Sequence, residues 1–279
     1  MAYPTIEKPY GLKPINLLGG QVFSGSTRNY PIQYSYASNI FYGDLVNIVR
    51  GTVVKNTSTT SGTGTGLVGV FLGCSFTNPL TGQKQFQQYW PASTLAGDCE
   101  AIVCDDPDTV FKVAVCSATT VIASASVAML GQNYGLIQNA GSTTTGNSAV
   151  SLLYSATLTT AAFPCRVVGL VEDSAYSYTG TGSTSSTTLT LTGTGLSGAS
   201  LTGADVAYVA ANGQIIGTGS FLTGAIASGG TSGTLNVAVA VPGSVTDIPA
   251  ASTVIVTMYP EVLVKLNFAV HSYYTATAV

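Results

Sequence analysis

The sequence predicts an all-β protein: a jelly-roll-like or β-sandwich core, a β insertion rich in Gly, Ser and Thr, and little helix. Short runs of Val, Ile, Thr, Tyr and Phe recur along the chain, and Gly, Asn, Asp or Pro bounds each run. β-branched and aromatic side chains fit a pleated, half-buried surface, and the bounding residues favour tight turns. With 279 residues, 46% of them hydrophobic, the chain is long enough for one large all-β domain or two smaller ones.

Eight segments show the strand pattern most clearly, and we expect the strands of the core there. The helical signal is weak, because residues 123–130 have room for a turn or two but lack a charged face and a 3.6-residue apolar stripe. Many short strands with Gly-rich turns are typical of sandwiches, jelly rolls and barrels. The expected strands cover residues 28–34, 45–49, 67–76, 84–90, 100–104, 110–116, 165–172 and 262–270.

Composition divides the chain into three parts. Residues 1–20 contain three prolines, which fix φ and lack a backbone donor, so we expect an extended N-terminal arm laid over a partner. Residues 21–177 carry most of the charges and aromatic rings, and we expect them to form the β core domain together with residues 253–279. Residues 178–252 are dominated by Gly, Ser, Thr and Ala, and we expect a β-rich insertion or a second small β domain.

The insertion carries its own strand signals. Residues 187–191 and 235–241 alternate apolar with small or polar side chains, as a half-buried strand does. Residues 205–210 and 214–216 flank the Asn-Gly pair at 212–213, which favours a tight hairpin turn because both residues tolerate positive φ. The alternative is a disordered low-complexity segment, although disorder usually carries more charge and fewer aliphatic side chains.

The charge distribution argues against several classes of partner. Only 8% of the residues are charged, the net charge is −3, and no Lys, Arg or His lies between Arg166 and Lys265. An ordinary soluble surface is about a quarter charged, so this surface must consist largely of hydroxyls, amides and backbone, which suits packing against other subunits. The basic residues are scattered, so we expect no nucleic-acid partner. No uninterrupted apolar run reaches about 20 residues, so we expect no membrane span.

The chain has five cysteines and no Cys-x-x-Cys pair. We expect buried thiols that pack as small hydrophobic groups, because free Cys commonly does so. A bridge between Cys99 and Cys104 across a tight turn is the alternative, but assembly in a reducing cytoplasm would leave the thiols free. Since the chain has a single histidine, we expect no zinc site and no cofactor.

The densest charge cluster lies at residues 98–108 and holds five of the twelve acids. Asp105, Asp106 and Asp108 surround Pro107, and Asp-Pro is typical of turns, because Asp side chains accept hydrogen bonds from local backbone N–H groups. We therefore interpret the cluster as a turn. Ion pairs between subunits and a Ca²⁺ site are the alternatives, although the residue order of an EF-hand loop is absent.

Two single residues stand out. His271 is the only possible imidazole base, but no nucleophile, zinc-protease or phosphate-loop motif accompanies it, so we expect a structural or interface histidine beside Tyr273 and Tyr274. We expect no enzyme activity, and a hydrolase or lyase on a β scaffold is the minor alternative. Trp90 ends an alternating aromatic run that we expect in the core or at a subunit interface, with a sugar-binding face as the alternative.

A series of short motifs occurs in a defined order along residues 1–175 and in the final strand. No single motif is a chemical signature, but their order resembles the head decoration, or capsid cement, proteins of tailed bacteriophages. The motifs are GLKPIN at 11–16, FSGSTR at 23–28, IFYGDLV at 40–46, GVFLGC at 69–74, QYWPA at 88–92, DDPDTVF at 105–111 and GSTTTGNS at 141–148.

The resemblance implies a jelly-roll-like structural protein on the outer surface of the capsid of a virion assembled in the host cytoplasm. Such a protein clamps neighbouring major capsid protein subunits and associates with itself as a dimer or trimer. The family has no catalytic residues to carry over. Residues 178–252 depart from the compact members of the family, which leaves the role of this region open.

We expect contacts with the capsid or between subunits from the N-terminal arm, the acidic turn and two aromatic positions. The alternative function is a phage tail, fibre or surface-adhesin module for host recognition, which the Gly/Ser/Thr-rich insertion favours. The candidate contact residues are Tyr3, Pro4, Ile6, Tyr10, Trp90, Asp105, Asp106, Asp108 and His271.

Overall fold

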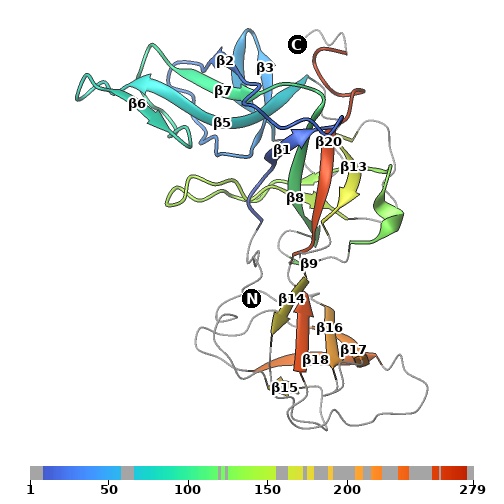
Figure 1. Cartoon of the computed structure of the whole chain (residues 1–279). Coiled ribbons are helices and arrows are strands. Elements are labelled where there is room, and N and C mark those ends of the chain that lie inside the picture. Colours follow the sequence, from blue (N-terminus) through green and yellow to red (C-terminus); the bar gives the residue numbers. More distant parts are fainter. Residues whose placement is uncertain are drawn as a thin grey trace. The chain divides into compact units, whose positions relative to one another are not determined.

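The computed structural model confirms the all-β class (Figure 1). In the described part of the chain, the only helical element is the 3-10 turn η1 (Val127–Met129), which lies within the segment expected to form a turn or two. No helix among these residues is long and apolar enough to cross a membrane. The structure describes residues 9–57, 66–118, 121–122, 125–154, 163–171, 175–178, 188–190, 205–209, 215–221, 232–238, 253–257 and 259–274.

The chain divides into two compact units, which we describe separately. The core unit comprises Pro9–Ala114, Ser126–Leu170 and Glu261–Val279, and the insert unit comprises Met1–Lys8, Val115–Ala125 and Val171–Pro260. The insert unit is larger than the expected range of 178–252. The reason lies in strand pairing: β19 (Thr253–Thr257), expected in the core, is hydrogen-bonded to strands of the insert unit on both sides.

One sheet of the core unit has the strand order β2-β7-β5-β3-β4, and β6 pairs with β5 outside this path. All its pairings are antiparallel. The central strand β5 has a register shift between Phe71 and Gly73, and beyond this shift β6 lies beside it. The strands are β2 (Arg28–Pro31), β3 (Leu45–Val49), β4 (Thr52–Lys55), β5 (Leu67–Thr77), β6 (Lys84–Gln87) and β7 (Glu100–Cys104).

A second sheet, most of whose strands belong to the core unit, has the order β10-β13-β20-β8-β12-β11, and β1 and β9 pair with β8 outside this path. Residues 115–118 of β8 and all of β9 are assigned to the insert unit. At one end of its central strands, Ala114 of β8 lies opposite Glu261 of β20, and Leu170 of β13 lies opposite Val262. The strands are β1 (Lys13–Leu17), β8 (Thr109–Ala118), β9 (Val121–Ile122), β10 (Asn133–Tyr134), β11 (Leu136–Ile137), β12 (Ser151–Leu153), β13 (Cys165–Leu170) and β20 (Glu261–Leu266).

Residues 9–17 belong to the core unit, so the prediction of an extended arm over residues 1–20 is wrong for this part. Leu12 is fully buried, and β1 forms an antiparallel pair with β8. Gly11 has a φ of +80°, and an added Cβ would lie 2.7 Å from Gly43 O, so a side chain does not fit there. Residues 1–8, including Tyr3, Pro4 and Ile6, lie outside the described residues.

Apolar side chains fill the core unit. A cluster on the β5 sheet surrounds Trp90, which meets the Phe76 ring edge-to-face with centroids 5.5 Å apart. Phe71, Val46 and Val103 are fully buried in the same cluster. The long apolar run of β5 is therefore explained by burial on both faces rather than by alternation.

The insert unit contains a six-stranded antiparallel sheet in the order β14-β19-β16-β17-β18-β15. The pairing of β16 with β17 confirms the predicted hairpin on either side of the Asn-Gly pair. β18 then pairs with both β17 and β15. These strands are β14 (Ala175–Tyr178), β15 (Thr188–Thr190), β16 (Asp205–Val209), β17 (Ile215–Phe221), β18 (Ser232–Ala238) and β19 (Thr253–Thr257).

All five cysteines are free and buried, which confirms the prediction of buried thiols and excludes the alternative bridge between Cys99 and Cys104. Burial raises the pKa of Cys74 and of Cys165 to about 12. Burial also raises the pKa of Cys104, to about 11. Because the thiolate is the reactive form, these side chains are protected from thiol reagents in two ways: reagents cannot reach them, and the thiols stay protonated.

We predict that a water-soluble disulfide reagent at pH 8 does not modify the native chain and modifies five thiols after unfolding in urea. The measurement is the absorbance of the released chromophore against time. A Thr81→Cys variant is the matched control, because Thr81 is exposed in the turn between β5 and β6 and its replacement should react at the rate of a free thiol. Fast labelling of the unmodified native chain would contradict the prediction.

Candidate functional site

The acidic segment between β7 and β8 is a turn, as predicted. Asp106 Oδ1 accepts a hydrogen bond from Asp108 N at 2.9 Å, and Asp106 O accepts one from Thr109 N at 3.1 Å. The three carboxylates do not converge, since Asp105 is buried with 3% exposure while the Asp108 side chain is 61% exposed. Among the residues that the structure describes, no three His, Cys, Asp or Glu side chains gather in a way that could hold a metal ion.

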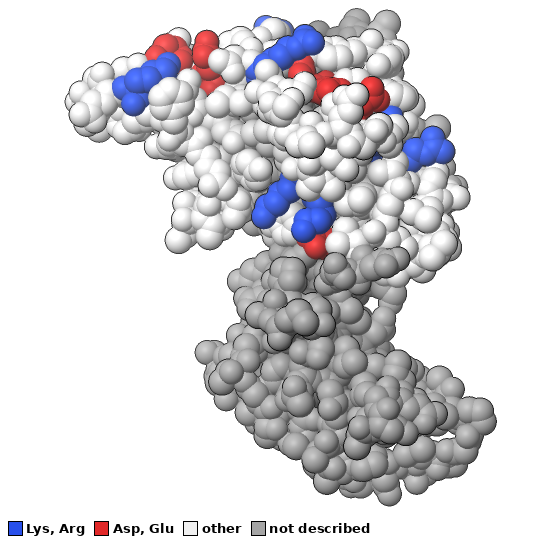
Figure 2. Space-filling view, viewed as in Figure 1, with Lys and Arg blue, Asp and Glu red and all other residues white. Residues whose placement is uncertain are grey.

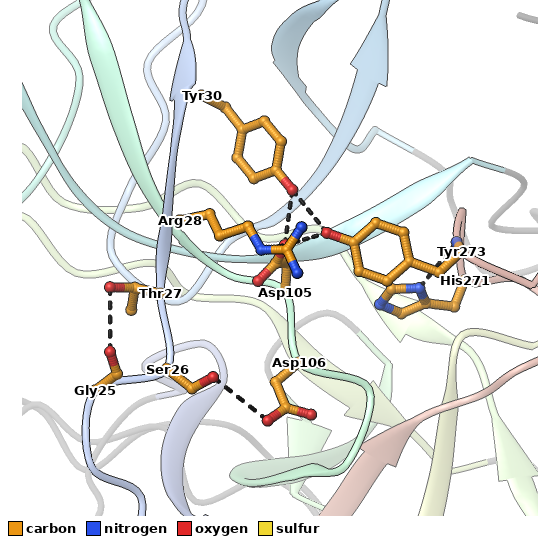
Figure 3. Close-up of polar contacts among 9 residues, drawn as sticks. All are labelled: Gly25, Ser26, Thr27, Arg28, Tyr30, Asp105, Asp106, His271 and Tyr273. Carbon is orange, nitrogen blue, oxygen red and sulfur yellow. Dashed lines mark hydrogen bonds and ion pairs between the residues drawn. The ribbon is translucent and has the colours of Figure 1, made fainter.

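Asp105 is the centre of a polar cluster, which we call the Asp105 site (Figure 3). Its Oδ2 accepts a hydrogen bond from the Tyr30 hydroxyl at 2.7 Å and another from the Tyr273 hydroxyl. Arg28 Nε lies 3.3 Å from the same oxygen, and the two Tyr hydroxyls are 2.8 Å apart. Arg28 and Tyr30 come from β2, whereas Tyr273 comes from the segment after β20, so one carboxylate ties the C-terminal segment to the β5 sheet.

His271 lies beside this site, so the structure brings two sequence-predicted residues together. The imidazole has 0% exposure, and its ring centroid is 4.9 Å from that of Tyr273 and 6.0 Å from that of Tyr274, which confirms the expected neighbours. His271 Nδ1 accepts a hydrogen bond from Tyr273 N at 3.3 Å, and the backbone of Asp105 also hydrogen-bonds with the ring. Burial lowers the pKa of His271, so the native structure holds the neutral imidazole.

The electrostatics of the Asp105 site favour a fixed structural contact. Burial raises the pKa of Tyr30, and its hydrogen bond with Tyr273 raises it further. Burial also raises the pKa of Tyr273, and the hydrogen bond to Asp105 adds to this effect. Both hydroxyls therefore remain protonated donors at neutral pH. Three donors on one carboxylate oxygen hold that group in place and leave it little freedom to exchange protons with a substrate.

A second buried carboxylate, Asp44, joins three segments of the core unit. Its Oδ2 accepts a hydrogen bond from Phe41 N at 2.8 Å and lies 2.8 Å from Lys55 Nζ. Ser148 Oγ donates to Asp44 Oδ1 at 2.6 Å and accepts from Val150 N at 3.1 Å. The Asp44 carboxylate is 1% exposed, so its charge is matched almost entirely inside the protein.

A third buried carboxylate, that of Glu261 at the start of β20, is a hydrogen-bond partner of Tyr10. The Tyr10 hydroxyl donates to Glu261 Oε1, and Lys112 Nζ lies 3.2 Å from Glu261 Oε2. Lys13 Nζ sits 4.2 Å from the centre of the Tyr10 ring. Tyr10 is thus half-buried and engaged within the core unit, which leaves only part of its ring for the predicted contact.

Burial overturns three of the predicted partner contacts: Trp90 and His271 have 0% exposure and Asp105 has 3%, so these side chains are held inside the core unit. Trp90 shows this most clearly. Its side chain has 0% exposure, and its Nε1 donates to Tyr36 O at 3.4 Å, so the ring is a core residue and cannot reach a partner. The same burial excludes Trp90 from a sugar-binding face. The run that contains it keeps one strongly exposed ring, Phe86, which is 76% exposed.

Sequence reasoning missed several partners in these sites. Arg28 and Tyr30 were expected only as strand residues, and Asp44 was expected only to precede a strand. One available signal was a single acid within the apolar run at residues 40–46, because an isolated charge in a core segment requires a buried partner. The identity of that partner, Lys55, depends on the pairing of β3 with β4.

Comparison of the chain with protein-family models, with curated proteins and with solved structures finds no match.

We predict that Asp44→Asn lowers the free energy of unfolding by about 3 kcal/mol, because it leaves the Lys55 ammonium without its buried counter-charge. The measurement is urea unfolding followed by the fluorescence of Trp90, the only tryptophan and a residue of the core unit. Asp98→Asn is the matched control, since Asp98 and Lys84 form a pair at 2.8 Å with side-chain exposures of 45% and 43%. The control should cost less than about 1 kcal/mol, and equal losses in the two variants would refute the prediction.

We predict that the core unit loses stability as the pH falls from 7 to 5, because burial lowers the native pKa of His271 while the unfolded chain protonates near its ordinary pKa of 6.5. Stability is full above pH 6.5 and declines as the pH falls towards the lowered pKa. The chain has one histidine, so the Trp90-detected unfolding free energy of His271→Gln should be nearly constant over this range. A wild-type stability that does not change between pH 7 and pH 5 would disprove it.

Proposed function

We propose that this chain is a structural virion protein that decorates the outside of a phage capsid and clamps neighbouring major capsid protein subunits. The observation that carries the proposal is the described surface of the core unit, which exposes large apolar side chains while most of its charges are paired. On the face shown in Figure 2, coloured charged atoms occupy small, separate areas of the described surface. A surface of this kind suits extensive contact with other proteins.

Several of the exposed apolar side chains lie at two places in the core unit. At the turn after β1, Leu18 is 49% exposed and Val22 80% exposed. At the end of the β5 sheet, Leu80 and Leu95 are 93% and 55% exposed beside one face, and Phe86 is 76% exposed on the other. Single exposed apolar residues are ordinary, but groups of them favour an interaction surface.

The paired charges lower the cost of forming such contacts. Within the core unit, Arg28, Lys55, Lys84, Lys112 and Lys265 each lie within 4.0 Å of a carboxylate oxygen. A contact over this surface therefore removes water from few uncompensated ions, and desolvation of ions is the main penalty in polar interfaces. On a symmetric shell, modest contacts repeat at every lattice position, so a contribution of a few kcal/mol per subunit is sufficient.

The other features of the chain accord with this role. Free, buried thiols suit assembly in the reducing cytoplasm of a host cell. The partners under this proposal are the major capsid protein and further copies of the chain. The alternative, a tail, fibre or adhesin module for host recognition, draws on one observation: the insert unit contains a six-stranded sheet, and its only basic residue is Lys8.

The copy number of the chain per purified virion tests the proposal against its alternative. Quantitative mass spectrometry of labelled peptides, with the major capsid protein as the internal reference, should give on the order of hundreds of copies in a simple ratio to capsid protein. The matched control is a known tail protein of the same particles. A copy number close to that of the tail protein would move the chain to the tail or fibres and refute the decoration role.

A further inference from the structure

Strand β6 is an open sheet edge. Among the residues that the structure describes, it pairs only with β5, in the register that sets Cys74 opposite Gln87 and Thr77 opposite Lys84. In Figure 1 the β5–β6 hairpin lies at the outer end of the β5 sheet, and β6 and β7 pair with opposite edges of β5. The outward-facing backbone N–H and C=O groups of β6 are therefore free to pair with another extended strand.

This edge carries only one of the devices that usually keep sheet edges apart, the charged side chain of Lys84. Such devices are charged side chains, proline and bulges. The strand at the opposite end of the same sheet, β2, also carries a proline, since it ends with Pro31. The only charge on β6, Lys84, forms an ion pair with Asp98 at 2.8 Å, so the approach of a second copy meets little repulsion.

Hydrogen bonds in its turn fix the conformation of the β5–β6 hairpin. In its turn, Asn78 N donates to Gln83 O at 2.9 Å and Asn78 Oδ1 accepts from Leu80 N at 2.9 Å. A strand that is already ordered loses little conformational entropy when it binds. The edge therefore offers a fixed set of backbone donors and acceptors.

Both faces of this edge present groups that a partner would cover. Gln85 lies opposite Phe76 and shares its face, where a groove of about 390 Å³ is lined by hairpin residues such as Leu80 and by Leu95 of the segment after β6. On the same face, the Gln87 Oε1 atom is buried and has no hydrogen-bond partner among the described residues. Phe86 points to the opposite face, where its ring is 76% exposed.

We propose that β6 of one copy pairs antiparallel with β6 of a second copy about a two-fold axis, which joins the two β5 sheets into one. Centred on Phe86, this register sets the two Phe86 rings opposite each other and sets Gln85 opposite Gln87 of the second copy. Opposed aromatic rings stabilise antiparallel pairs, and the Gln85 and Gln87 side chains of the two copies face each other without bringing like charges together. A two-fold axis makes the contact self-complementary, because each copy offers the same strand.

This inference deepens the proposed function and rests on it for the use of the dimer, which would bridge two capsid subunits. The pairing itself is measured on the isolated full chain, so the two proposals fail separately. A dimer in solution with a tail-like copy number in virions would refute the decoration role alone. A monomer in solution with a capsid-like copy number would refute the pairing alone.

The first experiment is sedimentation equilibrium of the full chain and of Phe86→Glu over a range of concentrations. The wild-type chain should form a dimer, and Phe86→Glu should weaken it about tenfold or more, because two carboxylates would lie opposite each other. Val22→Glu is the matched control: Val22 is 80% exposed and distant in sequence from β6, so its replacement should leave the dimer unchanged. Since Phe86 is itself exposed, the variant should fold, and equal circular dichroism spectra verify this.

The second experiment uses the buried state of the five native thiols. Phe86→Cys should form a disulfide-linked dimer on mild oxidation, because facing residues of an antiparallel pair have the Cα separation that a disulfide needs. Val22→Cys should remain unlinked. A monomeric wild-type chain, a trimer, or a dimer insensitive to Phe86→Glu would overturn the proposal. A monomer whose Phe86→Glu variant loses binding to capsids would also overturn it, and would assign the edge to the capsid protein instead.

Discussion

Three buried carboxylates, each matched by one cation and at least one hydroxyl, constrain how the core unit closes. Asp44, Asp105 and Glu261 have 0%, 3% and 5% exposure. Their hydroxyl partners lie 104, 168 and 251 residues away along the chain, so each carboxylate joins segments that sequence proximity would never bring together. An ionised carboxylate is very costly to bury without partners, so the core can close only when these segments meet. The sites therefore specify which segments meet, whatever their net contribution to stability.

The same constraint shapes the outside of the protein. A chain with twelve acids and nine basic residues that places three carboxylates inside has few charges left for its surface. The remaining surface is made of hydroxyls, amides, backbone and apolar side chains such as Phe86 and Leu80. This combination is poorly suited to binding ionic ligands and well suited to subunit contacts, which is how the buried ion pairs bear on the proposed role in a shell.

Local pattern predicted much of the fold, and the failures have physical causes. The strands at residues 45–49 and 100–104 match the expected bounds because turn residues flank a short β-branched run on both sides. The strand expected at 84–90 ends at Gln87, because Trp90 instead bridges Ile40 through the 2.7 Å bond from Trp90 N to Ile40 O. Residues 13–17 form β1 despite Pro14, since a bulge there accommodates proline in the pairing with β8. The convergence of Asp105 and His271 depends on long-range packing, which no local pattern encodes.

The ends of β8, β13 and β20 lie next to one another, so the segments that connect them can change in length. Ala114, Leu170 and Glu261 mark the points where the core unit ends or resumes, and the register brings these points to neighbouring positions in one sheet. A tight turn can span neighbouring strands, so the geometry of the core does not depend on how many residues lie between its exit and return points. Over evolutionary time, the segments between these points can therefore be lengthened, shortened or exchanged while the register of the core strands is kept.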